Sequence, residues 1–177
     1  MGIDSLSTPL HQAVKKLCEG PDGLYYALLF QGGITCFDKD IEKFLPVRFD
    51  KPLELKDILD FCWNDGSLYL VTSQGLFESR IVRKTEGKHD FVLCLLNPEP
   101  VVRGKVAHLC SDGKTNLYFS VNQRKVVHYD LVAKKTSLIK EYSVVNRLFL
   151  RHGYLWICRL WDDIICYDLK TNEERVI

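Results

Sequence analysis

The chain has 177 residues, and its 24 lysines and arginines against 23 aspartates and glutamates leave a formal net charge of +1. This balance excludes a chain-wide basic surface for nucleic acid and an acidic solvating tail. With 46% hydrophobic and 27% charged residues, the composition is that of a folded domain rather than a disordered segment. At this length we expect one domain.

The N-terminal segment, residues 1–12, is polar and lacks the apolar core of a signal peptide. The longest apolar run, residues 24–30, is far shorter than the roughly 18 residues that a membrane-spanning helix requires. We therefore expect neither secretion nor a membrane span. The predicted organisation is an N-terminal arm at 1–9 followed by a single domain at 10–177.

The sequence repeats itself, which is the strongest indication of its architecture. Residues 116–131 align without a gap with residues 154–169, and both copies end in Tyr-Asp-Leu. A third copy at 23–38 needs one additional residue in its turn, and a fourth at 67–78 is shorter at the same place. We set the register by the aromatic residue that follows a leucine in each copy, namely Tyr25, Tyr69, Tyr118 and Trp156.

Each copy contains four short apolar segments separated by turn residues. Period-two alternation with β-branched and aromatic residues predicts antiparallel strands. A sheet that is apolar on both faces cannot bury itself alone, so the copies must stack around a common axis. The sequence predicts an all-β fold, a propeller-like array of about four four-stranded antiparallel blades, at approximately 10–50, 51–98, 99–142 and 143–177.

These repeats resemble the β-propeller superfamily, and most nearly its WD-repeat-like branch. Three copies end their third strand in an aromatic residue and aspartate where WD repeats carry Trp-Asp: Phe37-Asp38, Tyr129-Asp130 and Tyr167-Asp168. No copy has the Gly-His that precedes the first strand of a WD repeat. The resemblance implies a rigid platform that binds other macromolecules, since enzymes are a minority of the superfamily.

The seven cysteines include no Cys-x-x-Cys pair and no histidine pair at zinc-ligand spacing. Cys36 and Cys166 share one repeat position inside apolar strands, and we expect the cysteines to be reduced and mostly buried. Reduced thiols predict the cytosol or nucleus as the compartment. His128 occupies the same repeat position, which favours a hydrogen-bonded structural histidine over a ligand or base. We expect no metal and no cofactor.

The aspartates that end the third strands, Asp38, Asp130 and Asp168, allow two interpretations. They could form a ring of carboxylates for acid–base chemistry, or they could cap turns by accepting backbone N–H bonds. We favour turn capping. No Gly-x-Ser-x-Gly elbow or phosphate-binding loop is present either, so we do not expect an enzyme.

The densest basic stretch contains Arg80, Arg83, Lys84 and Lys88. Acidic residues interrupt it and no stacking aromatics are interleaved, so we interpret it as a solvated loop, not a nucleic-acid surface.

Trp161 falls in the hairpin turn between the second and third strands of the last copy, where the sister copies carry polar residues. Together with Arg159 and Asp162 it has the composition of an interface hot spot. Alternatively, a tryptophan in a turn can fold back onto its own sheet. We keep both interpretations and name Trp161, Arg159 and Asp162 as candidate protein-interaction residues.

The functional hypothesis is a non-catalytic protein-binding scaffold or a subunit of a multiprotein assembly. Its partner would be another protein chain or a second copy, not nucleic acid or a membrane. Three architectures are open: a small closed ring, a piece of a longer propeller, or an open arc whose terminal faces are covered by another chain. The alternative is an enzyme or small-molecule-binding propeller with a site in the central channel, lined by Lys15, Asp60, His108 and Arg147.

Overall fold

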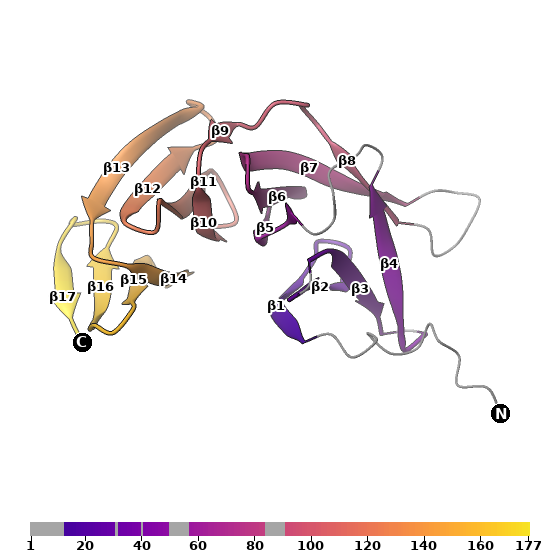
Figure 1. Ribbon diagram of the computed structural model, residues 1–177, viewed down its shortest axis with the longest axis horizontal. Coiled ribbons are helices and arrows are strands. Elements are labelled where there is room, and N and C mark those ends of the chain that lie inside the picture. Colours follow the sequence, from indigo (N-terminus) through magenta and orange to yellow (C-terminus); the bar gives the residue numbers. More distant parts are fainter. Residues whose placement is uncertain (1–12, 31, 40, 50–56, 84–90) are drawn as a thin grey trace.

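The computed structural model describes residues 13–30, 32–39, 41–49, 57–83 and 91–177. The expected N-terminal arm at 1–9 lies outside this part of the chain. The described residues contain no α-helix, and the all-β prediction is confirmed. Four-stranded antiparallel sheets follow one another as the four blades of a propeller-like array (Figure 1).

Each blade is a meander of four consecutive strands. Blade 1 comprises β1 (Val14–Glu19), β2 (Tyr25–Leu29), β3 (Ile34–Asp38) and β4 (Lys43–Phe49). Blade 2 comprises β5 (Asp60–Asn64), β6 (Ser67–Thr72), β7 (Gly75–Arg83) and β8 (Phe91–Leu95), and β9 (Val102–Arg103) follows it. Blade 3 comprises β10 (Val106–Ser111), β11 (Asn116–Val121), β12 (Lys125–Asp130) and β13 (Lys135–Glu141). Blade 4 comprises β14 (Val145–Arg151), β15 (Tyr154–Arg159), β16 (Ile164–Asp168) and β17 (Glu174–Val176).

The turn between the first and second strands carries a glycine in the left-handed region in every blade. The φ angles of these four glycines are 76°, 77°, 73° and 80°, at Gly23, Gly66, Gly113 and Gly153. Residues with a Cβ are sterically disfavoured in this region of φ. Glycine therefore recurs at this position because the turn has the same backbone conformation in every blade. In blades 2 and 4, Asp65 and His152 also have positive φ, which gives tight two-residue hairpins.

The strand register places equivalent aromatic residues at the middle strand of each blade. They are paired with third-strand residues as Tyr26↔Cys36, Tyr69↔Glu78, Tyr118↔His128 and Trp156↔Cys166. Successive side chains of a strand point to opposite faces of the sheet. We call the face that carries these aromatic side chains the leading face, and the opposite face the trailing face.

The core lies between blades, where the leading face of one blade packs on the trailing face of the next. Tyr26 of blade 1 packs with Leu68 and Leu70 of blade 2 in the first cluster. Tyr69 and Val71 of blade 2 pack with Leu117 and Phe119 of blade 3, and Tyr118 of blade 3 packs with Leu155 and Ile157 of blade 4. Burial at these contacts supplies most of the apolar stabilisation of the array.

The register of blade 1 corrects one sequence prediction. We placed the blade 1 aromatic at Tyr25, but Tyr26 occupies the position equivalent to Tyr69 and is fully buried, whereas Tyr25 is 37% exposed on the trailing face. Two adjacent tyrosines follow Leu24, and only packing against blade 2 distinguishes them. A slip of one residue exchanges the two faces of a strand, so the distinction decides which side chain enters the core.

Two strand pairings were not predicted from the sequence. The outer strands β4 and β8 pair in parallel, with Val47 opposite Phe91, and so join blades 1 and 2 into one continuous sheet. The two-residue strand β9 pairs with β7 at Gly75, where a Cβ would lie 2.1 Å from the carbonyl oxygen of Val102. Glycine at residue 75 therefore permits the close approach of β9.

The blades follow an open arc rather than a closed ring (Figure 1). The first strands β1, β5, β10 and β14 lie along the concave side, and blades 1 and 4 stand at the two ends. No strand of blade 1 pairs with a strand of blade 4 in the described residues. Of the three architectures that the sequence left open, the small closed ring is not adopted, whereas a piece of a longer propeller and an arc covered by another chain both agree with this shape.

None of the seven cysteines forms a disulfide bond. Cys36 and Cys62 are buried, but the other five are only half-buried, so the expectation that most would be buried is wrong. Cys158 and Cys166 lie in middle strands of blade 4, yet they remain partly accessible because no further blade covers that sheet. Their exposure follows from the position of blade 4 at the end of the arc.

Candidate functional site

The hairpin turn between β15 and β16 presents Trp161 to solvent. Its side chain is 95% exposed, and its backbone has a φ of 60°. The guanidinium of Arg159 lies 2.6 Å from the Asp162 carboxylate, and its Nε donates to the carbonyl oxygen of Asp163. The structure thus brings Arg159 and Asp162 together beside Trp161, and the interpretation in which Trp161 folds back onto its sheet is wrong.

The leading face of blade 4 lies at one end of the arc. It carries the ring pair Phe149–Trp156, stacked with centroids 5.8 Å apart, and Ile164 beside them. Phe149 is 41% exposed and Ile164 is 40% exposed. Trp156 itself is half-buried, whereas its equivalents in blades 1 to 3, which the next blade covers, are 0%, 4% and 7% exposed, at Tyr26, Tyr69 and Tyr118.

The trailing face of blade 1 lies at the other end. The register places Tyr25, Phe37 and Phe44 in one row across β2, β3 and β4, and the rings of Phe37 and Phe44 are 5.0 Å apart. Leu17 of β1, on the same face, is 59% exposed. Both ends of the arc therefore expose apolar side chains of the kind that the blade interfaces bury elsewhere.

The concave side holds a cavity of about 550 Å³ to which all four blades contribute. Lys15, Asp60, His108 and Arg147, the four channel residues named from the sequence, all line it. Lys16, which was not named from the sequence, also lines the cavity; the register of β1 is irregular between Val14 and Lys16.

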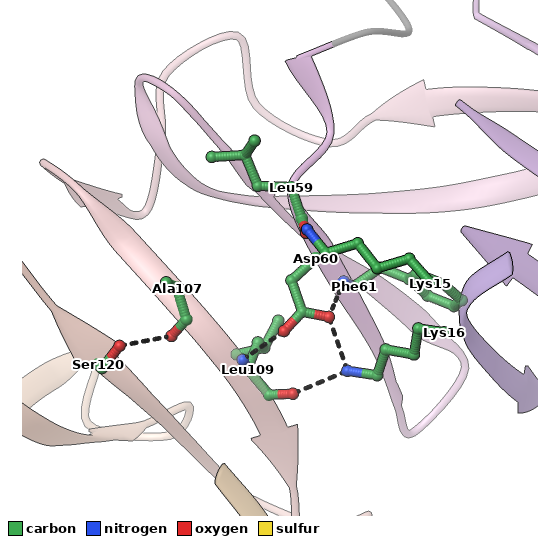
Figure 2. A network of polar contacts seen from close by, with 8 residues as sticks. All are labelled: Lys15, Lys16, Leu59, Asp60, Phe61, Ala107, Leu109 and Ser120. Atoms are coloured by element: carbon green, nitrogen blue, oxygen red, sulfur yellow. Dashed lines mark hydrogen bonds and ion pairs between the residues drawn. The ribbon is translucent and has the colours of Figure 1, made fainter. Parts of the chain in front are cut away.

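Asp60, which lines this cavity, connects three blades (Figure 2). One oxygen of its carboxylate accepts hydrogen bonds from the Lys16 ammonium of blade 1 at 2.8 Å and from the Phe61 N–H. The other oxygen accepts the Leu109 N–H of blade 3 at 2.7 Å, and Lys16 donates to the Leu109 carbonyl oxygen at 2.9 Å. The register of β10 shifts between Ala107 and Cys110, so Asp60 and Lys16 satisfy backbone groups of Leu109 beside this bulge.

His108 lies in the same bulge with a φ of 55°. Its Nε2 atom is buried without a hydrogen-bond partner. Burial lowers the pKa of His108, against the opposing effect of Asp60. The imidazole is therefore neutral at pH 7 and contributes no positive charge to the cavity.

The repeated aspartates and His128 have structural roles. Asp130 accepts the Val132 and Ala133 N–H bonds, and Asp168 accepts those of Lys170 and Thr171, so the turn-capping interpretation is confirmed for both. Asp38 is 6% exposed at the end of β3. His128 hydrogen-bonds with Asn116 at 2.6 Å and Ser137 at 3.2 Å, as expected for a structural histidine.

Of the basic stretch, Arg80 is exposed on β7, while Lys84 and Lys88 lie outside the described residues. Arg83 ends β7. Within the described ranges, no three histidine, cysteine or acidic residues gather in a way that could hold a metal ion. No helix of the described chain has the length and apolar character needed to cross a bilayer.

Comparison with solved structures identifies similar folds. An extracellular domain from B. thetaiotaomicron matches with a TM-score of 0.72 and 14% identity over 100% of this chain and 26% of its own. An auxiliary nutrient binding protein from the same organism matches with a TM-score of 0.64 and 16% identity over 93% of this chain and 41% of its own. A chain of the mitotic checkpoint complex matches with a TM-score of 0.59 and 16% identity over 94% of this chain and 52% of its own.

Neither a protein-family model nor a curated protein matches the sequence. At these identities the solved structures show the fold alone. The chain spans about half or less of the length of each of the three. The array described above is thus the propeller fold, at a length shorter than that of its structural neighbours.

Proposed function

We propose that this protein is a non-catalytic protein-binding scaffold, a subunit of a multiprotein assembly whose open array of blades another chain completes. The observation that carries the proposal is the uncovered leading face of blade 4, with Phe149 at 41% and the adjoining Trp161 at 95% exposure. Large exposed apolar patches on folded proteins mark interaction sites.

Trp161 has the properties of a binding anchor. Tryptophan and arginine are enriched among the residues that dominate binding energy, and both occur in this turn. The ion pair between Arg159 and Asp162 holds the turn on both sides of the indole, which limits the entropy that binding would cost. We propose that Trp161 inserts into an apolar pocket of a partner protein while Arg159 and Asp162 form the polar rim.

Two properties of the scaffold remain part of this proposal. The aromatic-aspartate ends of β12 and β16 support a WD-repeat-like propeller. The seven cysteines without disulfides support a reducing compartment, the cytosol or nucleus.

The concave cavity supports a second candidate, a small-molecule or enzyme site. Lys15 and Arg147 contribute positive charge there, and only Asp60 among the lining residues is acidic. Lys16 and Asp60 hydrogen-bond each other and the Leu109 backbone, and Lys15 donates to the Leu59 carbonyl oxygen at 2.6 Å. Lys15 and Arg147 are therefore the lining cations whose charge Asp60 does not neutralise directly. This candidate predicts an anionic ligand.

The test compares partner capture by the wild-type chain and by Trp161→Ala from the native cell extract. Truncating an anchor typically costs about 2 kcal/mol or more, a loss of roughly 30-fold in affinity. The control is Val132→Ala, since Val132 is 77% exposed in the turn after β12, away from the β15–β16 hairpin. Equal recovery of every partner by wild type and Trp161→Ala would remove Trp161 from the proposed interface.

A further inference from the structure

The two ends of the arc are complementary parts of one repeated interface. Within the chain, a leading face meets a trailing face three times, between blades 1 and 2, 2 and 3, and 3 and 4. The leading face of blade 4 and the trailing face of blade 1 are the members of this interface that have no counterpart in the described chain. Blades 1 and 4 of one chain stand at the two ends of the arc, and their described strands do not pair with each other (Figure 1).

We infer that the occupant of these faces is a second copy of this chain, and this inference rests on the proposed completion of the array by another chain. Blade 4 of each copy packs on blade 1 of the other, so two arcs close one ring of eight blades. A single two-fold axis relates the copies and creates the same blade contact twice. The closed ring then leaves no leading or trailing face uncovered.

Charge at the rim of the two faces also favours a second copy. Trp63 on the trailing face of blade 2 packs edge-on against Tyr26 at 5.1 Å. Cys18 is paired with Tyr26 in blade 1, as Cys62 is paired with Tyr69 in blade 2. The residues that follow these cysteines, Glu19 and Trp63, are therefore equivalent. Glu19 of one copy thus comes to lie at Trp156 of the other.

Two arginines flank Trp156 on the leading face of blade 4. Arg175 follows Cys166 in the row of Trp156, and Arg151 is paired with Tyr154 in the neighbouring row. Both arginines and Glu19 are exposed in the single chain. Asp168 lies in the row of Arg151, but its carboxylate already accepts the N–H groups of Lys170 and Thr171. The closed ring thus places the carboxylate of Glu19 near Arg151 and Arg175 of the second copy, which favours one register of the contact.

The first experiment measures the solution mass of the purified full chain by analytical ultracentrifugation across micromolar concentrations. A closed ring of two copies gives twice the monomer mass of 20.5 kDa and no larger species. Phe149→Glu, which introduces charge into the leading face of blade 4, is expected to give the monomer. Val132→Glu, at a residue 77% exposed in a blade 3 turn, is the matched control and keeps the wild-type mass.

The second experiment reverses charge at the rim without altering the apolar contact. Glu19→Arg and Arg151→Glu each raise the dimer dissociation constant by about 10-fold or more, and the double variant recovers most of the wild-type affinity. Because both residues are exposed, these variants fold even if Phe149→Glu does not.

Three outcomes overturn the inference: a wild-type monomer at all concentrations, a mass that grows into longer head-to-tail chains, or a double charge reversal that fails to restore association. A wild-type monomer that still loses partner proteins with Trp161→Ala removes the second copy but retains the proposed function. A dimer whose partner capture is unaffected by Trp161→Ala retains the second copy and removes Trp161 from the function.

Discussion

Removal of the Asp60 carboxylate tests whether one side chain holds three blades in place. In Asp60→Ala, the N–H groups of Phe61 and Leu109 lose their acceptor and the Lys16 ammonium loses its counterion. The side chains of Lys16 and Asp60 are 30% and 15% exposed, so water replaces these bonds only in part. Breaking a buried pair on one side costs about 3–5 kcal/mol.

At roughly 2–4 °C per kcal/mol for a chain of this size, Asp60→Ala lowers the melting temperature by about 6–20 °C. Urea denaturation at one fixed protein concentration measures the free energy of unfolding. Lys16→Met breaks the same pair from the other side, but Asp60 keeps both N–H donors, so we expect a smaller loss than in Asp60→Ala. In the double variant the costs are less than additive, because the two side chains contact each other. A loss below about 1 kcal/mol in Asp60→Ala would refute the role of this network.

The same pair makes stability depend on pH in the alkaline range. Burial alone lowers the pKa of Lys16, but the charge and hydrogen bond of Asp60 outweigh it, so the pKa lies above the ordinary value. A cation whose pKa is raised on folding stabilises the fold fully below its unfolded pKa, about 10.4, and this contribution disappears as the pH rises through the folded pKa. The difference between wild type and Asp60→Ala is therefore constant near neutral pH and shrinks in the alkaline range. It begins to shrink below about pH 10.4, because burial without Asp60 lowers the Lys16 pKa in the variant, and shrinks further as the pH rises through the raised Lys16 pKa of the wild type.

Two further predictions use repeat positions whose surroundings differ. Tyr26→Ala costs about 3–5 kcal/mol because Tyr26 is fully buried. Trp156→Ala at the equivalent position costs less than half as much when urea denaturation is run at a protein concentration at which the chain is monomeric, with the stacked Phe149 ring retained. Equal costs would show that blade 4 is covered within one chain. Thiol titration finds seven reactive groups after non-reducing denaturation. In the native state Cys62 and Cys110 react slowly, because burial raises the pKa of the Cys62 thiol and raises that of Cys110 to about 12. Rapid modification of both thiols would contradict their packing.

Local signals in the sequence were sufficient to predict the blades. Glycine turns, strand alternation and the repeat from Asn116 to Leu169 identified the strands, and the turn roles of Asp130 and Asp168 followed from their positions at strand ends. The concave-side residues were found because first strands of propeller blades face the axis. These features depend on neighbours in the chain or on the position within one repeat.

Features that depend on packing between blades could not be predicted in the same way. Tyr25 and Tyr26 offer two registers of equal local quality, and the contact with Trp63 selects one. The parallel pairing of β4 with β8 joins strands of different repeats, for which no local pattern exists. The Lys16–Asp60 contact spans 44 residues and serves a bulge in a third blade, so only the backbone of β10 could have indicated it.

The difference between an arc and a ring rests on the terminal blades. In arrays of repeats, each repeat contacts its neighbours and a terminal repeat normally carries a polar outer face. Blade 4 departs from this rule, because Phe149 and Ile164 keep the apolar character of an internal interface and are 41% and 40% exposed. A leading face built like an internal one supports the proposal that a further blade covers it. The trailing face of blade 1 in a second copy has the repeat position that such a contact requires.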